Sequence, residues 1–349
     1  MIKEAIDNIV SGRSLTFEQA TGVMDEIMSG KATPAQFGAF ATALRIKGET
    51  VDEIAGLASV MRANATPIEV SPPVVDTCGT GGDNSYSFNI STVAAFVAAG
   101  AGLKVAKHGN RAMSSRCGSA DVLESLGVKI DLGASAVAQC LETVGIGFMF
   151  APTFHPAMKY AAAPRREIGI RTAFNILGPL TNPARAEFQV VGVPSKELGE
   201  RIASALSRLG TKHSLVVHGV DGMDEISIGR ESLVWDVSQD KVSPPYEVSP
   251  QYFGFEKADI AEIQGGTPEG NAEMLRRILK GEKGTRRNIV VMNAAAALVA
   301  GNRASNLKEG ARIAEEAIDS GRAQAKLDKL VRLSQNLNNV IASEAKQSQ

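Results

Sequence analysis

The chain has 349 residues, of which 44% are hydrophobic and 21% are charged, and its formal net charge is −1. This length predicts about two domains, and the composition is typical of a soluble globular protein. A charge so close to neutral excludes a general affinity for polyanions, so we expect no nucleic-acid partner, and any phosphate site must come from a local arrangement of donors.

The sequence lacks the signals of secreted and membrane proteins. Charged residues interrupt its first twenty positions, and no apolar run is long enough to span a bilayer. We therefore expect a cytoplasmic protein with no membrane partner. The three cysteines are odd in number and lack C-x-x-C spacing, which argues against a disulfide framework or a zinc site. A catalytic thiol at Cys78 or Cys117 is an alternative to a small buried residue at either position.

The N-terminal part of the chain predicts four helices with clear starts. An apolar stripe of isoleucines and a valine marks the first helix. The others begin at capping boxes, which pair Thr16 with Gln19, Thr33 with Gln36, and Thr50 with Glu53. Pro34 suits a first helical position, and Gly48 suits a helix end. Residues 63–73 contain three prolines and predict a linker.

The stretch DTCGTGGDNSYSFNIST at residues 76–92 follows a predicted strand and leads into a predicted helix. Gly79, Gly81 and Gly82 lack a Cβ, so the backbone can bring its N–H groups close to a ligand. The start of a helix also offers unpaired N–H groups to an anion. Asp83 is a candidate metal ligand, and a plain strand-to-helix turn is the alternative. Three hydroxyl side chains are placed either to cap the helix or to bind phosphate: Ser87, Ser91 and Thr92.

A second polar cluster, KHGNRAMSS at residues 107–115, follows a predicted buried strand at residues 103–106. It combines two cations, an imidazole, an amide and two hydroxyls in a glycine-containing turn. Open α/β sheets bind ligands at the carboxyl ends of their strands. Because this cluster lies one βαβ step after the glycine-rich stretch, we expect both at the same edge of the sheet. A solvated polar loop is the alternative.

An acidic pair, Asp224 and Glu225, follows the predicted strand at residues 213–218. Adjacent carboxylates in a turn are often simply solvated, which is the alternative here. Mg²⁺, however, binds through one or two carboxylates together with substrate phosphates and waters. An acidic pair that faces basic, glycine-rich turns therefore predicts a metal held between the protein and a polyphosphate.

The remaining elements predict an α/β fold with a largely parallel sheet and crossover helices. Further short apolar runs, each a predicted strand, lie at residues 146–150, 188–193 and 214–217, and a predicted helix spans residues 195–209. Residues 171–183 predict a segment that is helical at first and breaks at Gly178-Pro179. Residues 305–333 predict two amphipathic helices, and residues 336–349 are expected to fray.

Taken in order, these motifs resemble the anthranilate phosphoribosyltransferase family. The resemblance rests on GTGGD at 79–83, NIST at 89–92, KHGNR at 107–111, GSAD at 118–121, RREIGIRT at 165–172, FNILGPLTNP at 174–183 and GMDE at 222–225. It extends to about residue 335. It implies the second step of tryptophan biosynthesis, in which anthranilate and phosphoribosyl pyrophosphate (PRPP) give N-(5-phosphoribosyl)anthranilate and pyrophosphate with Mg²⁺.

The same resemblance implies the organisation of the molecule. An all-helical domain is expected at residues 1–66, completed by part of residues 165–190. A larger α/β domain that binds the phosphoribosyl group, related to pyrimidine nucleoside phosphorylases, is expected at residues 74–335, before the frayed tail. The protein is expected to form a homodimer through its helical domain.

The resemblance also implies the site residues. Those expected at PRPP are Gly79, Gly82, Asp83, Ser87, Asn89, Ile90, Ser91, Thr92, Lys107, His108, Gly109, Asn110, Arg111, Ser114, Ser115 and Ser119. Those expected at anthranilate are Gly79, His108, Asn110, His155 and Arg165. The expected ligands of Mg²⁺ are Ser91, Asp224 and Glu225, and the expected catalytic residues are Lys107, Asp224 and Glu225. For Arg165 taken alone, a surface or intersubunit ion pair is the alternative.

A few positions depart from the family pattern. Cys78 stands where an aliphatic residue is expected, Asn84 where glycine is frequent, and Arg116-Cys117 where Lys-Ser is frequent. None of these departures removes a charge or a ligand that the chemistry needs. Asn84 leaves the detailed shape of the first turn open.

The chemistry of PRPP agrees with these residues. Breaking the bond at ribose C1 builds positive charge on the sugar and negative charge on the leaving group, so Mg²⁺, Lys107 and the turn amides would act by stabilising pyrophosphate. Two other function classes stay open. A nucleoside phosphorylase would use inorganic phosphate and a nucleobase, whereas a non-catalytic nucleic-acid-binding relative should lack Asn110 and Arg165 and carry a basic groove.

Overall fold

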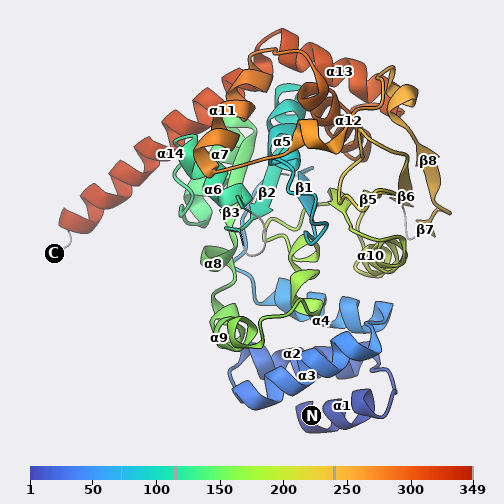
Figure 1. Cartoon of the computed structure of the whole chain (residues 1–349). Coiled ribbons are helices and arrows are strands. Elements are labelled where there is room, and N and C mark those ends of the chain that lie inside the picture. The colour runs from blue at the N-terminus through green and yellow to red at the C-terminus, as the bar shows by residue number, and fades with distance from the viewer. Residues whose placement is uncertain (72, 113–115, 239–240, 348–349) are drawn as a thin grey trace.

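The structure, a computed structural model, describes residues 1–71, 73–112, 116–238 and 241–347. A helical bundle lies at one end of the molecule and a larger α/β domain at the other (Figure 1). Within the described ranges, no helix combines the length and the apolar character needed to cross a membrane.

The N-terminal bundle is built from α1 (Ile2–Val10), α2 (Phe17–Met28), α3 (Pro34–Lys47) and α4 (Val51–Ala63). Each of the three predicted capping boxes is present at the start of α2, α3 and α4. Pro34 lies in the first turn of α3, and Gly48 ends that helix with a φ of 86°. Loss of one such cap typically costs about 1 kcal/mol, so local sequence contributes directly to these helix ends.

The α/β domain is organised around one sheet with the strand order β3-β2-β1-β4-β5-β6-β7, and β8 pairs with β6. The strands are β1 (Val75–Gly79), β2 (Val105–Gly109), β3 (Ile146–Phe150), β4 (Phe188–Gly192), β5 (His213–Gly219), β6 (Ser232–Ser238), β7 (Lys241–Val242) and β8 (Tyr246–Val248). Strands β1 to β5 run parallel, and the pairings of β6 with β5, β7 and β8 are antiparallel. The predicted fold class is therefore confirmed, with an antiparallel edge in addition.

Helices cover both faces of this sheet. The main ones are α5 (Ile90–Gly100), α10 (Lys196–Arg208), α11 (Pro268–Leu279), α12 (Thr285–Ala300), α13 (Leu307–Asp319) and α14 (Arg322–Gln347). Shorter elements are α6 (Ser119–Ser125), α7 (Ala134–Val144), α8 (Ala151–Phe154), α9 (Lys159–Ile168) and the 3₁₀ turns η1 (Pro156–Met158), η2 (Ala173–Asn175), η3 (Gly178–Leu180), η4 (Pro250–Phe253) and η5 (Ile260–Ile263). Helices α5 and α12 pack on one face, and α10 lies on the other, next to α4.

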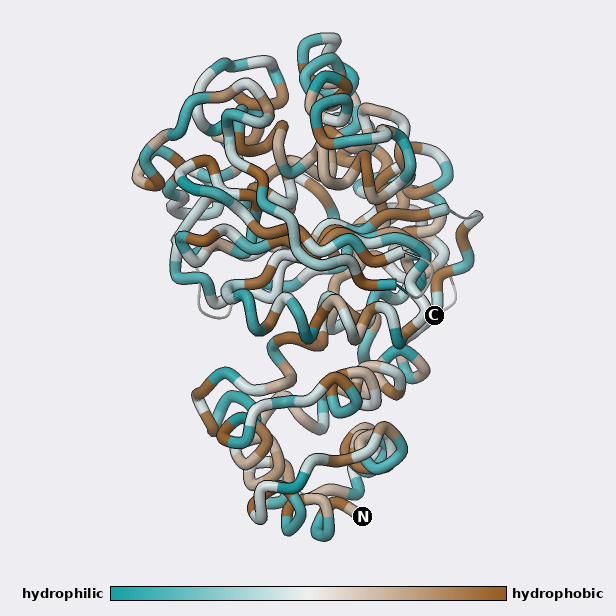
Figure 2. The backbone as a smooth tube through the Cα atoms, turned by 90° about the vertical axis from the view of Figure 1, so that its right-hand side faces the viewer, coloured by the Kyte–Doolittle hydropathy of each residue, from teal (hydrophilic) through white to brown (hydrophobic). Residues whose placement is uncertain are grey.

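Side chains on the central strands alternate between two cores. On β4, Val190 faces the core formed with α5 and α12, whereas Val191 faces a second core that also contains the bundle helices. Val216 on β5 and Trp235 on β6 belong to the second core as well. In Figure 2 hydrophobic stretches, drawn in brown, run through the sheet and along the bundle. The bundle and the sheet therefore share a continuous apolar core.

The segment after β3 returns to the bundle. Helix α9 packs on α2 and α3, and the Phe174 ring lies 4.8 Å, between centroids, from that of Phe37 on α3. Residues 171–183 were expected to begin as a helix, and this prediction is wrong in detail. Gly169 ends α9 in the left-handed conformation with a φ of 68°, and only the short turns η2 and η3 follow.

The C-terminal part contains the two predicted helices, α13 and α14. Helix α14 continues to Gln347 and projects from the body of the molecule (Figure 1). It thus includes most of the segment for which we expected fraying, and fraying of residues 336–349 stays a prediction.

Candidate functional site

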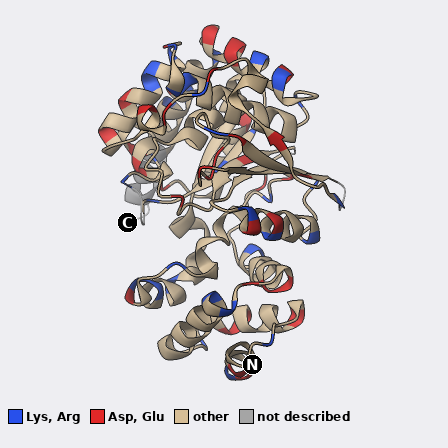
Figure 3. Ribbon diagram, turned by 45° about the vertical axis from the view of Figure 1, so that its right-hand side comes forward, with Lys and Arg blue, Asp and Glu red and all other residues tan. Residues whose placement is uncertain are grey.

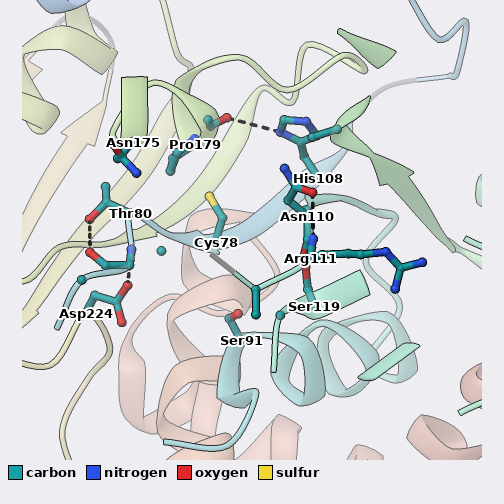
Figure 4. A pocket seen from close by; sticks show the side chains of 18 of the residues that line it. Cys78, Thr80, Ser91, His108, Asn110, Arg111, Ser119, Asn175, Pro179 and Asp224 are labelled. Atoms are coloured by element: carbon teal, nitrogen blue, oxygen red, sulfur yellow. Dashed lines mark hydrogen bonds between the residues drawn. The ribbon is translucent and has the colours of Figure 1, made fainter. Parts of the chain in front are cut away.

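A cavity of about 760 Å³ lies between the bundle and the carboxyl ends of the parallel strands (Figure 4). Eighteen predicted site residues line it: Gly79, Gly82, Asp83, Ser87, Asn89, Ile90, Ser91, Thr92, Lys107, His108, Gly109, Asn110, Arg111, Ser119, His155, Arg165, Asp224 and Glu225. The remaining two, Ser114 and Ser115, fall outside the described residues. The structure therefore brings together the two polar clusters and the acidic pair, which are far apart in the sequence.

The acidic pair lies directly against the glycine-rich stretch. Asp224 Oδ2 accepts a hydrogen bond of 2.8 Å from the Gly81 N–H. Glu225 Oε1 accepts one of 3.1 Å from the Ser91 N–H, in the first turn of α5. Both carboxylates thus point toward backbone N–H groups, one in a turn and one at a helix start, where negative charge is stabilised.

Two glycines make room for Asp224. Gly79 and Gly192 are directly paired at the ends of β1 and β4. An ideal Cβ added to Gly79 would collide with the Asp224 carboxylate, and one added to Gly192 would collide with the Asp224 main chain. The role of Gly192 was not predicted. Its sequence signal is a glycine that ends a buried strand, which is weak by itself.

The turn after Gly79 has a backbone that few residue types adopt. Gly81 and Gly82 have φ values of 67° and 84°, and Asn84 has a φ of 54°. Asparagine tolerates this left-handed region better than most side chains do. The departure from glycine at position 84 is therefore compatible with the turn.

The start of α5 does not use its hydroxyl groups as caps. Asn89 occupies the N-cap position without a side-chain cap. Instead, its Nδ2 donates to the Cys117 carbonyl at 3.0 Å, and its Oδ1 accepts from Asn271 Nδ2 at 2.9 Å. The buried Thr92 Oγ1 has no hydrogen-bond partner among the described residues. The capping role is thus not observed at this helix start, and phosphate binding by these hydroxyls stays a prediction.

The buried acidic pair must be neutralised, either by protons or by a cation. Burial raises the pKa of Asp224 and of Glu225, and the charges of Asp83 on the first and of Asp224 on the second raise them further. Such a cluster binds either protons or a cation. In the part of the chain that the structure describes, no group of three or more His, Cys, Asp and Glu side chains could hold a metal alone. Mg²⁺ fits an incomplete set of hard oxygen ligands, because it keeps waters and adds substrate phosphates.

Lys107 lies beneath the cavity and inside β2. We expected it in a turn, but pairing with β3 continues through Gly109 and holds it in the strand. Its side chain is only 3% exposed, and Nζ donates to the Thr77 carbonyl at 2.6 Å and to Ser91 Oγ at 3.4 Å. Burial lowers the pKa of Lys107, and the charge of Asp76 opposes this shift. The lysine thus brings a buried positive charge next to Ser91.

Asp76 was not predicted as a site residue, but it holds two parts of the site together. It is fully buried, and its carboxylate accepts hydrogen bonds from the His108 N–H at 3.3 Å and from Asn182 Nδ2 at 2.7 Å. Asn182 Nδ2 also donates to the Ala106 carbonyl at 2.8 Å. The segment after η3 is thereby fixed to β1 and β2. The sequence signal that could have indicated this role is an acidic residue inside an otherwise apolar strand.

His108 and His155 form a buried pair whose rings are 5.0 Å apart. Burial lowers the pKa of His108 to about 3 and that of His155 to about 4. Both rings are therefore neutral near pH 7. His108 Nδ1 lies 3.3 Å from the Gly178 carbonyl, which can only accept, so Nδ1 carries the proton and Nε2 is an acceptor. Nε2 of His108 and both ring nitrogens of His155 have no partner among the described residues.

Arg165 faces the cavity from the last turn of α9. Burial lowers its pKa, and no described carboxylate lies within ion-pair distance. Within the described chain Arg165 therefore forms no surface ion pair, and an intersubunit ion pair stays the alternative. A guanidinium in this situation favours a carboxylate ligand, because its planar fork binds two oxygens at once.

Arg111 is at the rim of the site. Its guanidinium contacts Asp121 at 3.0 Å and Glu124 at 2.7 Å, and it points away from Asp224 (Figure 4). Its backbone N–H donates to Asn110 Oδ1 at 2.8 Å, and Ser119 Oγ donates to the Asn110 carbonyl at 3.4 Å. These contacts connect Asn110 and Arg111 to α6.

Several residues without a predicted role also line the cavity, including Met61, Arg171, Phe174, Asn175 and Pro179, and so do the two candidate thiols, Cys78 and Cys117. Burial raises the pKa of Cys78 well above its usual value, and that of Cys117 to about 11. Both thiols therefore stay protonated near neutral pH, which disfavours a thiolate nucleophile.

Comparisons with known proteins agree with this geometry. The model of the glycosyl transferase family a/b domain matches residues 71–324, and that of the helical bundle domain of the same family matches residues 3–65. Anthranilate phosphoribosyltransferases from Dehalococcoides mccartyi and Chloroflexus aggregans are 59% and 58% identical to this chain, over 97% and 95% of it and over 99% and 98% of their own lengths.

Two solved structures are also similar. The anthranilate phosphoribosyltransferase of Thermus thermophilus has a TM-score of 0.90 and 43% identity, with 95% of this chain and 99% of that chain covered. The enzyme of Saccharomyces cerevisiae, in complex with PRPP and Mg, has a TM-score of 0.88 and 28% identity, with 96% and 98% covered.

Proposed function

This chain belongs to the anthranilate phosphoribosyltransferase family, and on that premise we propose that it transfers the 5-phosphoribosyl group of PRPP to the amine of anthranilate. The products are N-(5-phosphoribosyl)anthranilate and pyrophosphate, which is the second step of tryptophan biosynthesis from chorismate. One observation carries the proposal: the acidic pair is hydrogen-bonded to the glycine turn and to the start of α5, in the cavity that Arg165 faces.

PRPP binding is assigned to the residues around the start of α5 and the end of β2. The unpaired Thr92 hydroxyl supports this assignment, as does the left-handed Gly82, whose N–H has no acceptor among the described residues. Lys107 adds positive charge beneath Ser91. Fixed donors of this kind stabilise the negative charge that develops on a leaving group.

Mg²⁺ is assigned to Asp224, Glu225 and Ser91. When bound, it would neutralise the charge of the diphosphate as a Lewis acid. The relative from Saccharomyces cerevisiae was solved with PRPP and Mg, which supports the same cofactor here. The carboxylates keep their positions through the Gly81 and Ser91 N–H groups.

Anthranilate is assigned to the side of the cavity formed by Arg165, His155, His108, Asn110 and Gly79. Arg165 would bind the carboxylate, and the acceptor nitrogens of the neutral histidines suit the amine N–H groups. Aromatic amines are weak nucleophiles. Holding the amine close to ribose C1 raises the rate, because the entropy cost of bringing the two reactants together is met on binding. No dedicated general base is required in this scheme.

The proposed organisation is a helical domain at residues 1–66, completed by part of residues 165–190, and an α/β domain at residues 74–335. A homodimer formed through the helical domain is part of the proposal by family resemblance, and Val10 and Ile46 leave apolar side chains 73% and 82% exposed on that domain. Sedimentation analysis tests the dimer, and a monomer at micromolar concentration would contradict it. A cytoplasmic location stays a prediction.

The two alternative functions have less support. Acidic and basic residues are interspersed along the outer helices (Figure 3), which does not favour a nucleic-acid-binding surface. A nucleoside phosphorylase would not need Arg165 to bind a carboxylate.

A fluorescence assay of anthranilate consumption tests the proposed function. We expect loss of anthranilate emission only when both PRPP and Mg²⁺ are present. No loss under these conditions, together with phosphate-dependent cleavage of uridine or thymidine, would replace the proposal with the phosphorylase. Tight DNA binding at moderate salt, without anthranilate consumption, would replace it with the nucleic-acid-binding alternative.

A further inference from the structure

Arg171 contacts the glycine turn from the opposite side to the acidic pair. Its Nη2 donates hydrogen bonds to the Thr80 carbonyl at 2.9 Å and to the Gly81 carbonyl at 2.8 Å. An ideal Cβ on Gly82 would collide with the guanidinium, so Gly82 is packed against it. One side chain therefore contacts three consecutive residues of the turn.

These contacts fix the directions of two peptide groups. In a trans peptide the C=O and N–H point in opposite directions. With the Thr80 carbonyl on Arg171, the Gly81 N–H points away and donates to Asp224 at 2.8 Å. With the Gly81 carbonyl on Arg171, the Gly82 N–H also points away, and no described atom accepts from it. Arg171 thus holds the turn in the orientation that presents its N–H groups to the acid and to a ligand.

Arg171 reaches the turn from a segment anchored in the bundle. It lies two residues before Ala173, which is fully buried in the core shared with the bundle, and three before Phe174, which packs on Phe37 of α3. The turn itself belongs to the sheet, since the Thr80 N–H donates to the Gly192 carbonyl at 2.9 Å. The arginine therefore bridges the two sides of the cavity.

We propose that Arg171 is a positioning residue for PRPP: it sets the orientation of the Thr80–Gly82 peptides and makes this orientation depend on the placement of the bundle. The inference deepens the proposed function and rests on it for the identity of the ligand. Arg171 acts through the turn and is distinct from Arg165, which faces the cavity without contacting the turn.

Hydrogen exchange of the substrate-free protein tests the first part, because it does not depend on activity. In Arg171→Ala, the amides of Thr80 and Gly81, which donate to Gly192 and Asp224, should exchange at least about tenfold faster, which corresponds to the loss of one charge-assisted hydrogen bond. Arg166→Ala, which removes an exposed arginine of the same segment, should leave them unchanged. Equal exchange in Arg171→Ala and the wild type would overturn the proposal.

Steady-state kinetics test the link to PRPP. Arg171→Ala should raise KM for PRPP about tenfold or more, with KM for anthranilate within about twofold, and Arg171→Lys should recover part of the loss because it can reach one carbonyl. If Arg171 had only a general structural role, Arg171→Ala would lower the thermal midpoint and raise KM for both substrates equally. That result would overturn the assignment. If Arg171→Ala fails to fold, the lysine variant decides by the same two measurements. An inactive wild-type protein would remove the proposed function, while the exchange result would still decide the role of Arg171 in the turn.

A matched pair of core variants tests the dependence on the bundle. Phe37→Leu loosens the contact with Phe174, whereas Phe40→Leu removes a similar volume from the same helix and core, away from that ring pair. We expect exchange of the Thr80 and Gly81 amides to rise at least about threefold more in Phe37→Leu, a difference of roughly 0.65 kcal/mol. Equal effects of the two variants would overturn the coupling to the bundle.

Discussion

The main chain of Asp224 occupies the space that any side chain at position 192 would need, because an ideal Cβ on Gly192 coincides with the Asp224 carbonyl group. Since the contact is with backbone, the clash cannot be relieved by a rotamer change. Gly192→Ala should therefore displace the acidic pair and lower kcat/KM at least about tenfold, in addition to destabilising the fold by about 1–3 kcal/mol. Activity and thermal unfolding measure the two effects.

Gly38→Ala on α3 is the control for this substitution. An added Cβ there meets no heavy atom within 4 Å. Alanine also favours a helix over glycine by about 0.5–1 kcal/mol, so this variant should be slightly more stable and fully active. Wild-type activity in Gly192→Ala would contradict the tight fit between β4 and the acidic pair.

The acidic pair is expected to determine how the reaction rate depends on Mg²⁺. Changing Asp224 to Asn and Glu225 to Gln keeps the shapes but removes both charges, so turnover should fall by about 10²–10³-fold and the Mg²⁺ concentration for half-maximal rate should rise. A titration of rate against Mg²⁺ measures both. Glu247→Gln, an exposed acid on β8, is the control. Normal kinetics in the double variant would refute the metal role.

Arg165 is expected to discriminate between the two substrates. Its guanidinium has no described acidic partner, so Arg165→Ala removes a ligand for anthranilate without breaking a structural ion pair. KM for anthranilate should rise about tenfold or more, and the affinity for PRPP should change little. Arg165→Lys should recover only part of the loss, because lysine lacks the bidentate fork. Equal losses for both substrates would contradict this division.

The buried histidine pair predicts a stability that falls in acid. In the folded protein the pKa of His108 is lowered to about 3 and that of His155 to about 4, from 6.5. The unfolded chain therefore binds more protons below pH 6.5, and each histidine removes up to about 1.36 kcal/mol of stability per pH unit as the pH falls from 6.5 toward its folded pKa. Urea unfolding followed by the emission of the single tryptophan, Trp235, measures this slope.

The matching variant replaces both histidines by glutamine and should flatten the slope between pH 6.5 and 4. His213 is the control, because its hydrogen bond with Asp236 raises its pKa. The stability that His213 contributes is present below its pKa in the unfolded chain, and it is lost as the pH rises through its pKa in the folded protein. His213→Gln should therefore leave the acidic slope in place, and an unchanged slope in the double variant would show that other groups cause it.

Local signals were sufficient for much of the fold. A capping box such as that of Thr16 and Gln19 satisfies its own backbone groups within one turn, so it marks a helix start regardless of what packs around it. The shared edge of the two polar clusters followed from the geometry of parallel strands. The site could thus be located from sequence because its parts follow strand ends.

Other features depended on contacts that no local pattern records. Lys107 was expected in a turn, but pairing with β3 extends the strand past it. Arg171 was part of a recognised motif, yet its bonds to Thr80 and Gly81 cross about ninety residues of sequence. Gly192 acquires its role only from the position of Asp224. In each case tertiary packing decides the function of the residue.

The apolar core that contains Val191, Trp235 and the bundle helices joins the bundle to the α/β domain along α4 and α10. On the side of the cavity that Arg165 and Arg171 line, the hydrogen bonds of Arg171 to Thr80 and Gly81 connect the bundle to the sheet through polar groups. A rotation of the bundle about its apolar contact with the sheet would therefore change these hydrogen bonds before it opened the core.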